Sequence, residues 1–385
     1  MPSNIISLSE VCVIKQCGTT PDVLDDSNWN GNYPWLSSGE TSSLFIFDTE
    51  KHISKKAIDN YKMKIIPRNS IVIARSGQGH TRGQVSMCMI DTFVNDGLIV
   101  IIPNLDVIDP HYLLYNLASR YDEIRQLSDA NSCRGNINAK ILAGMTIVLP
   151  ALDIQRKIGH FLFSVDNKIR HNTQINDNLS KIVETLFSEM MQSSLLFDTT
   201  LGSIATITMG QSPPGDSLSE DNTGTLFYQG RAEFGSCFPS PRLYTTNPKR
   251  MAKEGSVLVS VRAPVGDINL ALHDCCIGRG LASIESKTGL NGFIHYLLKY
   301  IKPDLDVFNG DGTVFGSITK DALNGLKISI PDEESIKQFN LFADFLDRQI
   351  RTNHMECLIL IELRDYLLPR LMSGEIDVSS LPLPS

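Results

Sequence analysis

The sequence has no cysteine pattern that would bind a metal or form a disulfide framework. Among its eight cysteines, Cys12 and Cys17 lie too far apart for a zinc knuckle, Cys275 and Cys276 are adjacent, and no Cys-x-x-Cys occurs. These spacings exclude a zinc-finger protein and a disulfide-stabilised secreted scaffold, and they predict reduced, mostly buried thiols. We therefore expect neither a metal site nor another cofactor.

Long apolar runs and a signal peptide are also missing. No run reaches the roughly 18 apolar residues that cross a bilayer. The N-terminus, Met1-Pro2-Ser3-Asn4, has neither the basic nor the apolar region of a signal peptide. The sequence therefore predicts a cytoplasmic protein with no membrane partner. Its 385 residues suffice for two or three domains, and a hydrophobic content of 42% indicates that they are globular.

The common catalytic motifs are absent. There is no Walker A loop, no His-Glu-x-x-His and no Gly-x-Ser-x-Gly. Asp109-Pro110-His111-Tyr112 differs at its third residue from the Asp-Pro-Pro-Tyr motif of adenine methyltransferases, and no glycine-rich site for a methyl donor precedes it. It predicts a helix start instead, with Asp109 as the N-cap. A methyltransferase or nuclease with its own active site is therefore the less favoured interpretation.

The chain contains an internal repeat of about half its length. Four segments recur in the same order: 8–21 in 201–213, 69–75 in 255–262, 147–150 in 328–331, and 166–172 in 347–353. This period is far longer than the roughly 20–50 residues of a solenoid repeat, so the pattern indicates two tandem domains. The residues between these segments differ, which suggests two copies of one binding module that recognise different things.

Each half begins with short strands. β-Branched and apolar runs, such as 71–74 and 257–259, predict buried strands separated by turns that contain glycine or asparagine. A helix is expected from Asp109 to about Leu127.

Each half ends with a long helix. Apolar residues step by three and four from Ile154 to Met190, and again from Glu334 to about Met372. The first helix is either continuous or broken near 171–173, and Pro369 is expected to bend or shorten the second. A helix over 154–190 would be about 55 Å long, which outruns a domain of about 150 residues. We therefore expect the two helices to pair in antiparallel fashion along their apolar stripes.

The charge distribution suggests a nucleic-acid partner, although the net charge of −8 alone argues against one. Residues 60–90 contain five Lys or Arg and no Asp or Glu, and 130–150 also lack acids. Residues 222–253 contain five basic residues and one Glu. Local basic faces can bind phosphates while the rest of a protein stays acidic. A solvated surface with chance gaps in the acids is the alternative.

Polar residues at the predicted strand ends and loops are candidates for DNA contact. The loop 77–83 is rich in glycine without the dinucleotide-binding spacing, so it suits a phosphate; a flexible hairpin tip is the alternative. Arginine suits guanine and phosphate, whereas Gln and Asn suit adenine. The candidates are Arg75, Gln78, His80, Arg82, Gln84 and Arg134 in the first half, and Tyr228, Gln229, Arg231, Arg262 and Arg279 in the second. For each of them a scaffold or surface role is the alternative.

Several stretches resemble the DNA specificity subunits of type I restriction–modification systems. Residues 210–214 (Gly-Gln-Ser-Pro-Pro) and 227–230 resemble the opening of that family's target-recognition domains. Residues 261–266 resemble its central strand and loop, and 364–376 resemble its C-terminus. The first half departs from the pattern, with Gly-Thr-Thr-Pro at 18–21. The resemblance covers essentially the whole chain.

The repeat and the resemblance together imply an α+β fold. It has two tandem target-recognition domains of mixed β-sheet and short helices, each followed by a long helix, and the helices pair as an antiparallel coiled coil. The expected divisions are target-recognition domain 1 at 1–150, spacer helix 1 at 151–197, target-recognition domain 2 at 198–331, spacer helix 2 at 332–376 and a tail at 377–385.

The resemblance also implies a non-catalytic function. Each domain would recognise one half of a bipartite double-stranded DNA target, and the helices would fix the gap and dock two methylation subunits. Adenine-N6 methylation and ATP-dependent cleavage would belong to the methylation and restriction subunits. Candidate docking residues are Ile158, Phe161, Val165, Ile169, Phe342, Leu346, Ile350 and Leu367. An oligomerising scaffold with no DNA role is the alternative.

Overall fold

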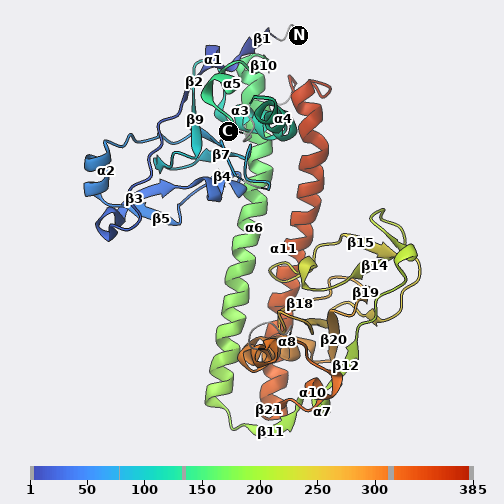
Figure 1. Ribbon diagram of the computed structural model, residues 1–385. Helices are drawn as coiled ribbons and strands as arrows, with labels where there is room; N and C mark the ends of the chain where they lie inside the picture. Colours follow the sequence, from blue (N-terminus) through green and yellow to red (C-terminus); the bar gives the residue numbers. More distant parts are fainter. Residues whose placement is uncertain (1–3, 78, 132–135, 311–315, 381–385) are drawn as a thin grey trace. The chain divides into compact units, whose positions relative to one another are not determined.

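The computed structural model describes residues 4–77, 79–131, 136–310 and 316–380. The chain forms two compact units, and unit 1 is assembled from both ends of the sequence. Unit 1 comprises Met1–Ile169 and Leu358–Ser385, and unit 2 comprises Arg170–Cys357. Two long helices, α6 (Leu152–Ser193) and α11 (Glu333–Ser373), each contribute one part to each unit (Figure 1).

Unit 1 is built on two mixed sheets. Its strands are β1 (Asn4–Ser7), β2 (Cys12–Lys15), β3 (Trp29–Leu36), β4 (Phe45–Ile46), β5 (Lys51–Ile53), β6 (Ile71–Ala74), β7 (Val85–Cys88), β8 (Phe93–Val94), β9 (Leu98–Pro103) and β10 (Thr146–Leu149). The five-stranded sheet has the order β2-β9-β6-β7-β4, and β4 is parallel to β7. The three-stranded sheet has the order β5-β3-β8, and β3 is parallel to β8. A separate antiparallel pair joins β1 to β10.

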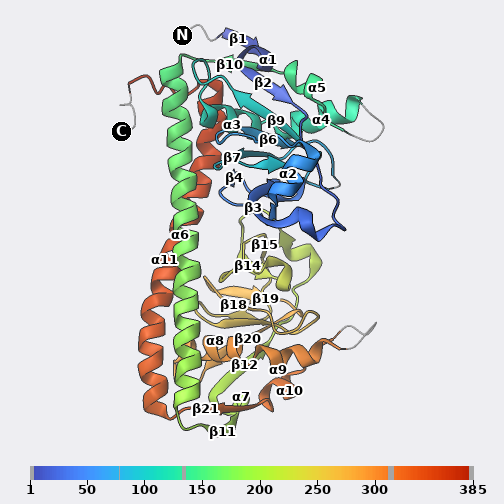
Figure 2. The same ribbon diagram turned by 90° about the vertical axis from the view of Figure 1, so that its left-hand side faces the viewer.

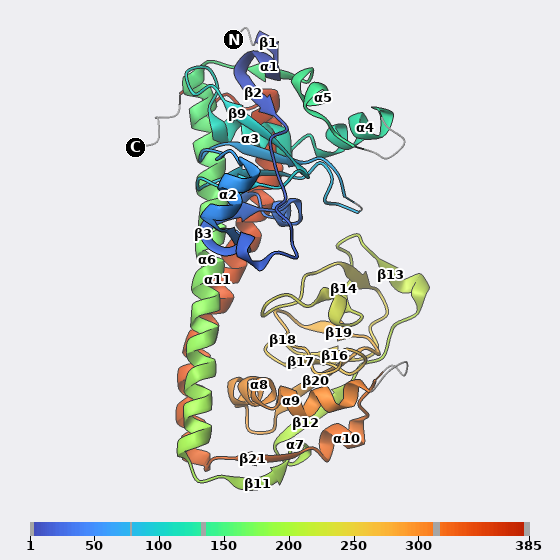
Figure 3. The same ribbon diagram turned by 60° about the vertical axis from the view of Figure 1, so that its left-hand side comes forward.

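The main core of unit 1 lies between the five-stranded sheet and the long helices. The short helices are α1 (Leu8–Val11), α2 (Lys55–Tyr61), α3 (Pro110–Ala118), α4 (Tyr121–Asn131) and α5 (Ala139–Ala143). Helix α3 lies beside α6 (Figure 3), and the core joins Ile71 of the sheet, Tyr112 of α3, Ile158 of α6 and Leu371 of α11. The C-terminal part of the chain therefore completes the core of the N-terminal domain.

The predicted start of α3 is confirmed, but its predicted length is wrong. The Asp109 carboxylate accepts a hydrogen bond from the backbone N–H of Tyr112 at 2.9 Å, with a proline in the first turn. The helix ends at Ala118 instead of reaching Leu127, and α4 follows as a separate helix. At the break, the Arg120 guanidinium donates to the carbonyl oxygen of Thr146 at 2.8 Å, which anchors the turn to β10.

Unit 2 repeats the mixed-sheet plan. Its strands are β11 (Phe197–Thr200), β12 (Ala205–Met209), β13 (Leu218–Ser219), β14 (Thr225–Tyr228), β15 (Leu243–Thr245), β16 (Met251–Ala252), β17 (Val257–Ser260), β18 (Ile268–Leu270), β19 (Cys275–Ile277), β20 (Leu281–Ser286) and β21 (Lys327–Ile330). A four-stranded antiparallel sheet has the order β12-β20-β17-β18. A five-stranded sheet has the order β13-β15-β14-β19-β16, and β14 is parallel to β19. A separate antiparallel pair joins β11 to β21.

The helices of unit 2 are also placed as in unit 1. The short helices are α7 (Leu201–Ile204), α8 (Asn291–Tyr300), α9 (Lys302–Asp306) and α10 (Lys320–Asn324). Helix α8 lies between the four-stranded sheet and the long helices (Figure 2). The rings of Phe293 on α8 and Phe187 on α6 are 5.6 Å apart, and Phe187 is 5.1 Å from Phe339 on α11. Aromatic packing therefore joins the three helices.

Polar contacts fix how α6 pairs with α11. In unit 2, the Asn172 amide donates to Glu356 at 2.7 Å, and the Asn353 amide donates to Asn176 at 2.8 Å. The α11 partner number falls as the α6 number rises, so the helices run antiparallel in this unit, as predicted. Asn172 and Asn353 are buried, and a buried amide needs a specific partner, so these contacts select one register.

The structure decides between the two alternatives for the first long helix and corrects one expectation for the second. Helix α6 is continuous through 171–173, since Asn172 bonds across to α11 and does not interrupt its own helix. Helix α11 passes Pro369 and ends at Ser373, so the proline does not shorten it there. The Arg370 guanidinium donates to the carbonyl oxygen of Tyr366 at 2.7 Å, which supplies a partner to the backbone near this proline.

The repeat places a tyrosine–aspartate pair between the short helix and the long helix of each unit. In unit 1, the Tyr115 hydroxyl donates to Asp166, and Arg364 forms an ion pair with the same carboxylate at 2.6 Å. In unit 2, the Tyr296 hydroxyl donates to Asp347 at 2.7 Å. Within the described part of the chain, no ion pair with Asp347 occurs.

Asp347 is therefore a half-buried carboxyl that forms no ion pair of its own. Burial raises its pKa from the usual 3.8 to about 6, although the Tyr296 hydroxyl and Lys299 lower it. Because the folded-state pKa exceeds the unfolded-state value, ionising Asp347 opposes folding. This destabilisation is absent at low pH, develops between about pH 4 and pH 6, and is complete above that range.

Replacing Asp347 with Asn should therefore stabilise the protein at neutral pH. The amide oxygen can still accept from Tyr296, and the cost of a buried charge is removed. A pKa raised from 3.8 to about 6 corresponds to about 3 kcal/mol at full effect. Urea denaturation of both proteins should show a gain for Asp347→Asn at pH 7.5 that shrinks towards pH 4.

Asp166→Asn is the matched control, since it makes the same change at the equivalent position. It breaks the ion pair with Arg364, so it should destabilise the protein at pH 7.5. A loss of stability with Asp347→Asn at pH 7.5 would contradict the assignment of a costly buried charge.

Candidate nucleic-acid interface

The two units share an arrangement in which a short turn leads from one sheet to the next. In unit 1 the β8–β9 turn (95–97) makes this connection, and in unit 2 the β19–β20 turn (278–280) does so. In both, the first backbone N–H of the turn donates to the last carbonyl oxygen of the neighbouring parallel strand. The distances are 2.9 Å to Leu36 in unit 1 and 2.8 Å to Tyr228 in unit 2. The two turns are therefore structural equivalents.

A glycine brings another segment against each turn. A Cβ atom on Gly18 would lie 1.8 Å from the carbonyl oxygen of Asn95, and one on Gly210 would lie 2.1 Å from that of Gly278. No side chain fits at such distances. Steric exclusion therefore explains why glycine occupies this position in both Gly-x-x-Pro segments. The residue that follows each glycine donates its backbone N–H to the carbonyl oxygen of the last strand residue before the turn. This distance is 3.0 Å in unit 1 and 2.9 Å in unit 2.

The end of the central strand also meets each turn, and here the sequence alignment of the repeats is corrected. The backbone N–H of Arg75 donates to the carbonyl oxygen of Gly97 at 2.9 Å, and that of Val261 donates to Gly280 at 2.9 Å. Arg75 therefore corresponds to Val261, not to Arg262. Because successive side chains of an extended strand point to opposite sides, Arg75 and Arg262 are not equivalent contacts.

Four residues at these strand ends form what we call the strand-end face of unit 2: Ser212, Gln229, Arg262 and Arg279. The last three are exposed, and the backbone N–H of Arg279 donates to the Ser212 hydroxyl at 3.4 Å. Within the described residues, the side chains of Gln229, Arg262 and Arg279 form no hydrogen bond or ion pair. Two unpaired guanidinium groups and an amide can bind phosphates and base edges.

The equivalent residues form the strand-end face of unit 1: Thr20, Ser37, Ser76 and Asp96, in the same order. Asp96 is exposed and accepts a hydrogen bond from the Thr20 hydroxyl at 2.6 Å. Arg75 is half-buried and donates to the backbone carbonyl oxygen of Asp96 at 3.4 Å. This face was not predicted, because the Gly-x-x-Pro segment is the one feature of the sequence that indicates it. The two faces share a backbone and differ in their side chains.

One predicted DNA contact belongs to the core instead. Tyr228 is 1% exposed, and its hydroxyl donates to the carbonyl oxygen of Pro239 at 3.3 Å. It occupies the position of Leu36, which is also buried in unit 1. The structure therefore contradicts the assignment of Tyr228, while the next residue, Gln229, is exposed.

The loop after β6 carries several predicted contacts, and two of them hold the local structure. The Arg82 side chain is 11% exposed and forms an ion pair with Asp129 at 2.7 Å. The Gln84 amide oxygen accepts from the Thr41 hydroxyl at 3.2 Å. His80 is exposed. Two further predicted contacts lie outside the described residues: Gln78 and Arg134.

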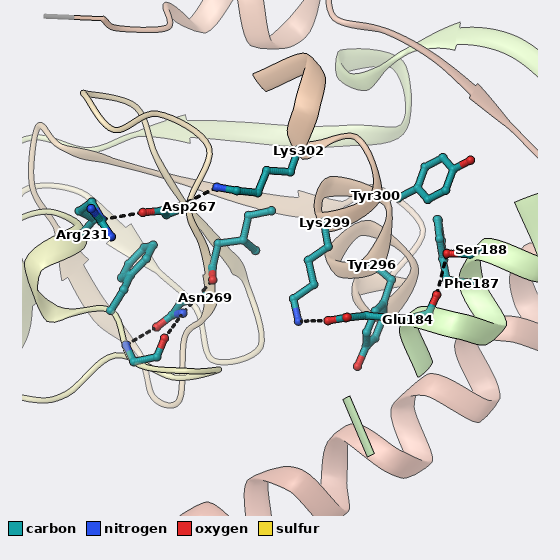
Figure 4. Close-up of a pocket in the computed structure, with 13 residues that line it drawn as sticks. Glu184, Phe187, Ser188, Arg231, Asp267, Asn269, Tyr296, Lys299, Tyr300 and Lys302 are labelled. Carbon is teal, nitrogen blue, oxygen red and sulfur yellow. Dashed lines mark hydrogen bonds and ion pairs between the residues drawn. The ribbon is translucent and has the colours of Figure 1, made fainter. Parts of the chain in front are cut away.

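Arg231 lines a cavity of about 560 Å³ within unit 2 (Figure 4). Arg231 and Lys302 both form ion pairs with Asp267, at 2.5 Å and 2.8 Å, and Lys299 pairs with Glu184 at 2.9 Å. Each of these cations has a carboxylate beside it, so the cavity is not a free basic surface. Arg231 is therefore a weaker candidate for phosphate contact than Arg262 or Arg279.

The apolar helix residues predicted to dock a partner differ in exposure. Three are buried in this chain itself, so the structure contradicts their assignment: Ile158, Val165 and Ile350. Three are half-buried: Ile169, Leu346 and Leu367. Phe161 and Phe342 are 36% and 44% exposed and can meet a partner.

The remaining chemistry of the described residues is limited. No group of three or more His, Cys, Asp or Glu side chains there is placed to hold a metal ion, and no helix there is long and apolar enough to cross a membrane. The cysteines described by the structure are free. Burial raises the pKa of Cys12, Cys88, Cys237 and Cys275 to about 12, so these thiols stay protonated near neutral pH.

A family model for the type I restriction modification DNA specificity domain matches residues 2–181 and 198–363. The chain belongs to this family. The two matches correspond to the two repeats, each with mixed sheets and a long helix. Specificity subunits are non-catalytic, and the enzymatic activity lies in other subunits.

Individual relatives support the same assignment. The MjaX specificity subunit of a type I restriction enzyme from Methanocaldococcus jannaschii is 33% identical over 306 residues, covering 74% of this chain and 72% of the relative. The MjaIX specificity subunit from the same organism is 22% identical over 405 residues, covering 94% and 91%. The solved S subunit from M. genitalium shares the fold, with a TM-score of 0.68, 15% identity and coverage of 98% and 97%.

Tyr228→Phe tests the placement of this side chain in the core. Because the hydroxyl is buried, its removal should leave DNA affinity and target unchanged and lower the free energy of unfolding by about 1 kcal/mol. Urea denaturation and electrophoretic mobility shift of the assembled complex measure the two quantities. Gln229→Ala, at the adjacent exposed position, is the control and should show the reverse pattern. A changed DNA target in Tyr228→Phe would sink the assignment.

Proposed function

We propose that this chain gives a type I restriction–modification complex its DNA sequence specificity, with each unit recognising one half of a bipartite double-stranded target. The observation that carries the proposal is the recurrence of one hydrogen-bonded strand-end face with different exposed side chains. The same rigid backbone holds both faces, so the two units differ in the side chains that can contact bases. Family membership supports the same function.

The charge of the chain fits a subunit that works within a complex. Arg262 and Arg279 can supply contacts to guanine or phosphate in unit 2. The net charge of −8 opposes strong non-specific binding by the chain alone, so we assign much of the phosphate contact to the partner subunits. A cytoplasmic location belongs to the same proposal.

The long helices suit a spacer role. Helix α6 has 42 residues, which corresponds to about 63 Å. This length is close to two turns of B-DNA at about 34–36 Å per turn. We therefore assign to α6 and α11 the separation of the two half-sites.

Repeated apolar residues mark two equivalent surfaces for partners. The repeat matches Phe161 with Phe342 and Ile182 with Leu363, and the members of each pair are similarly exposed: 36% and 44%, then 47% and 41%. Unit 1 carries Phe161 and Leu363, and unit 2 carries the other two. Exposed apolar groups at repeated positions are typical of interfaces. We assign one surface to each of two methylation subunits, in a complex that also binds restriction subunits.

A map of modified bases tests the specificity role. The chain is expressed with its methylation subunit, and modified bases are mapped across a host genome with and without it. Two short half-sites with a fixed gap should appear when the chain is present. Arg262→Ala should degrade one half-site, with a loss of about 1–3 kcal/mol if it contacts a base.

Lys327→Ala is the control for this change, since it removes one positive charge from an exposed residue of β21, in the separate β11–β21 pair. It should leave the target unchanged. A stable complex that adds no modification in a bipartite sequence would refute the specificity role and favour a scaffold.

Docking can be tested by placing a charge on each apolar surface. Phe161→Asp should release one methylation subunit, Phe342→Asp the other, and the double variant both. Native mass spectrometry of the complex measures this stoichiometry. Ile175→Asp is the control, because Ile175 is 46% exposed on α6 but its repeat counterpart is Glu356. Full retention of both subunits by the double variant would contradict the assignment.

A further inference from the structure

The two equivalent turns carry opposite charges at the same position. The hydrogen bonds that match Gly97 with Gly280 also match the preceding residues, Asp96 and Arg279. Both side chains are exposed. At this position unit 1 therefore presents a carboxylate, which only accepts hydrogen bonds, and unit 2 presents a guanidinium, which only donates them.

The backbone fixes both positions firmly. Each turn is bonded to the neighbouring parallel strand and to the central strand, and Gly18 or Gly210 closes against it. In unit 1, the Thr20 hydroxyl bonds one carboxylate oxygen of Asp96 at 2.6 Å, which leaves the second oxygen available to a ligand. In unit 2, the Arg279 backbone is bonded to Ser212 and its guanidinium has no partner among the described residues.

An exposed carboxylate on a DNA-binding face needs a specific explanation, since it repels phosphates. It is stabilised only where the base edge supplies a hydrogen-bond donor, and in the major groove the donors are the amino groups of cytosine and adenine. Guanine presents two acceptors there, which suit arginine and repel a carboxylate. The same position in the two units is therefore complementary to different bases.

We propose that Asp96 and Arg279 are equivalent specificity-determining residues. Arg279 selects a guanine in the half-site of unit 2, and Asp96 selects a base with a major-groove amino group in the half-site of unit 1. This inference rests on the proposed function and adds the chemistry that makes the two half-sites different.

The experiment maps modified bases for complexes that contain Asp96→Ala, Asp96→Arg or Arg279→Gln. Because Asp96→Ala removes the acceptor, it should lower the preference for an amino-bearing base at one position by about 5- to 150-fold, and Asp96→Arg should change that position to guanine. Arg279→Gln should weaken selection of guanine in the other half-site and favour adenine there. Each variant should leave the opposite half-site unchanged.

Asp106→Ala is the matched control for unit 1, because Asp106 is exposed beyond the far end of β9. Lys327→Ala serves unit 2, since Lys327 is exposed on β21, in the separate β11–β21 pair. Both controls should keep the original target. Unchanged half-sites in all three turn variants, with modification continuing, would overturn the inference and leave the proposed function standing. Absence of a bipartite sequence with the unaltered chain would instead overturn the proposed function.

If a variant abolishes modification, its base preference can still be measured by DNA binding. Competition is measured between the target duplex and a duplex in which the base implicated for Asp96 lacks its exocyclic amino group. The unaltered complex should prefer the natural duplex by about 5- to 150-fold, and the Asp96→Ala complex should bind both more equally. An unchanged preference in Asp96→Ala would overturn the role of Asp96.

Discussion

The fold of each unit depends on the pairing of α6 with α11. Unit 1 is closed by the last part of α11, whose Leu371 lies in the same core as Ile158 and the five-stranded sheet. In unit 2, the buried Asn172 and Asn353 allow one register, since any shift would leave an amide without a partner. Each repeat therefore needs helix residues encoded by the other, and a chain cut between the repeats would lack part of both units.

The strand-end faces depend on a second constraint, the close approach of backbones at each turn. Gly18 and Gly210 leave no room for a side chain, and three backbone hydrogen bonds repeat around each turn. The backbone is thus the same where the exposed side chains differ most. This arrangement lets a sequence change in one face alter recognition without a cost to the core, as is common for binding residues on loops held by a rigid scaffold.

Much of the fold could be predicted from the sequence, because the repeat, the long apolar periodicities and the N-cap at Asp109 are local signals. The predictions were wrong where tertiary contacts determine which residues are equivalent and which side chains are exposed. A one-residue offset matched Arg75 with Arg262, although backbone hydrogen bonds match it with Val261. Tyr228 looked like a contact because an aromatic beside a glutamine is ambiguous until burial is known. Asp96 was missed because no pattern marks an acid as part of a DNA-binding face.

The most direct test of this account is hydrogen–deuterium exchange in the intact complex with its methylation subunits, measured with and without the target duplex. The account predicts slower exchange in both turns, 95–97 and 278–280, when the full target binds. A duplex that retains only the half-site of unit 2 should slow exchange in 278–280 alone. Protection elsewhere in both units, with the two turns unchanged, would contradict the claim that these strand ends contact DNA.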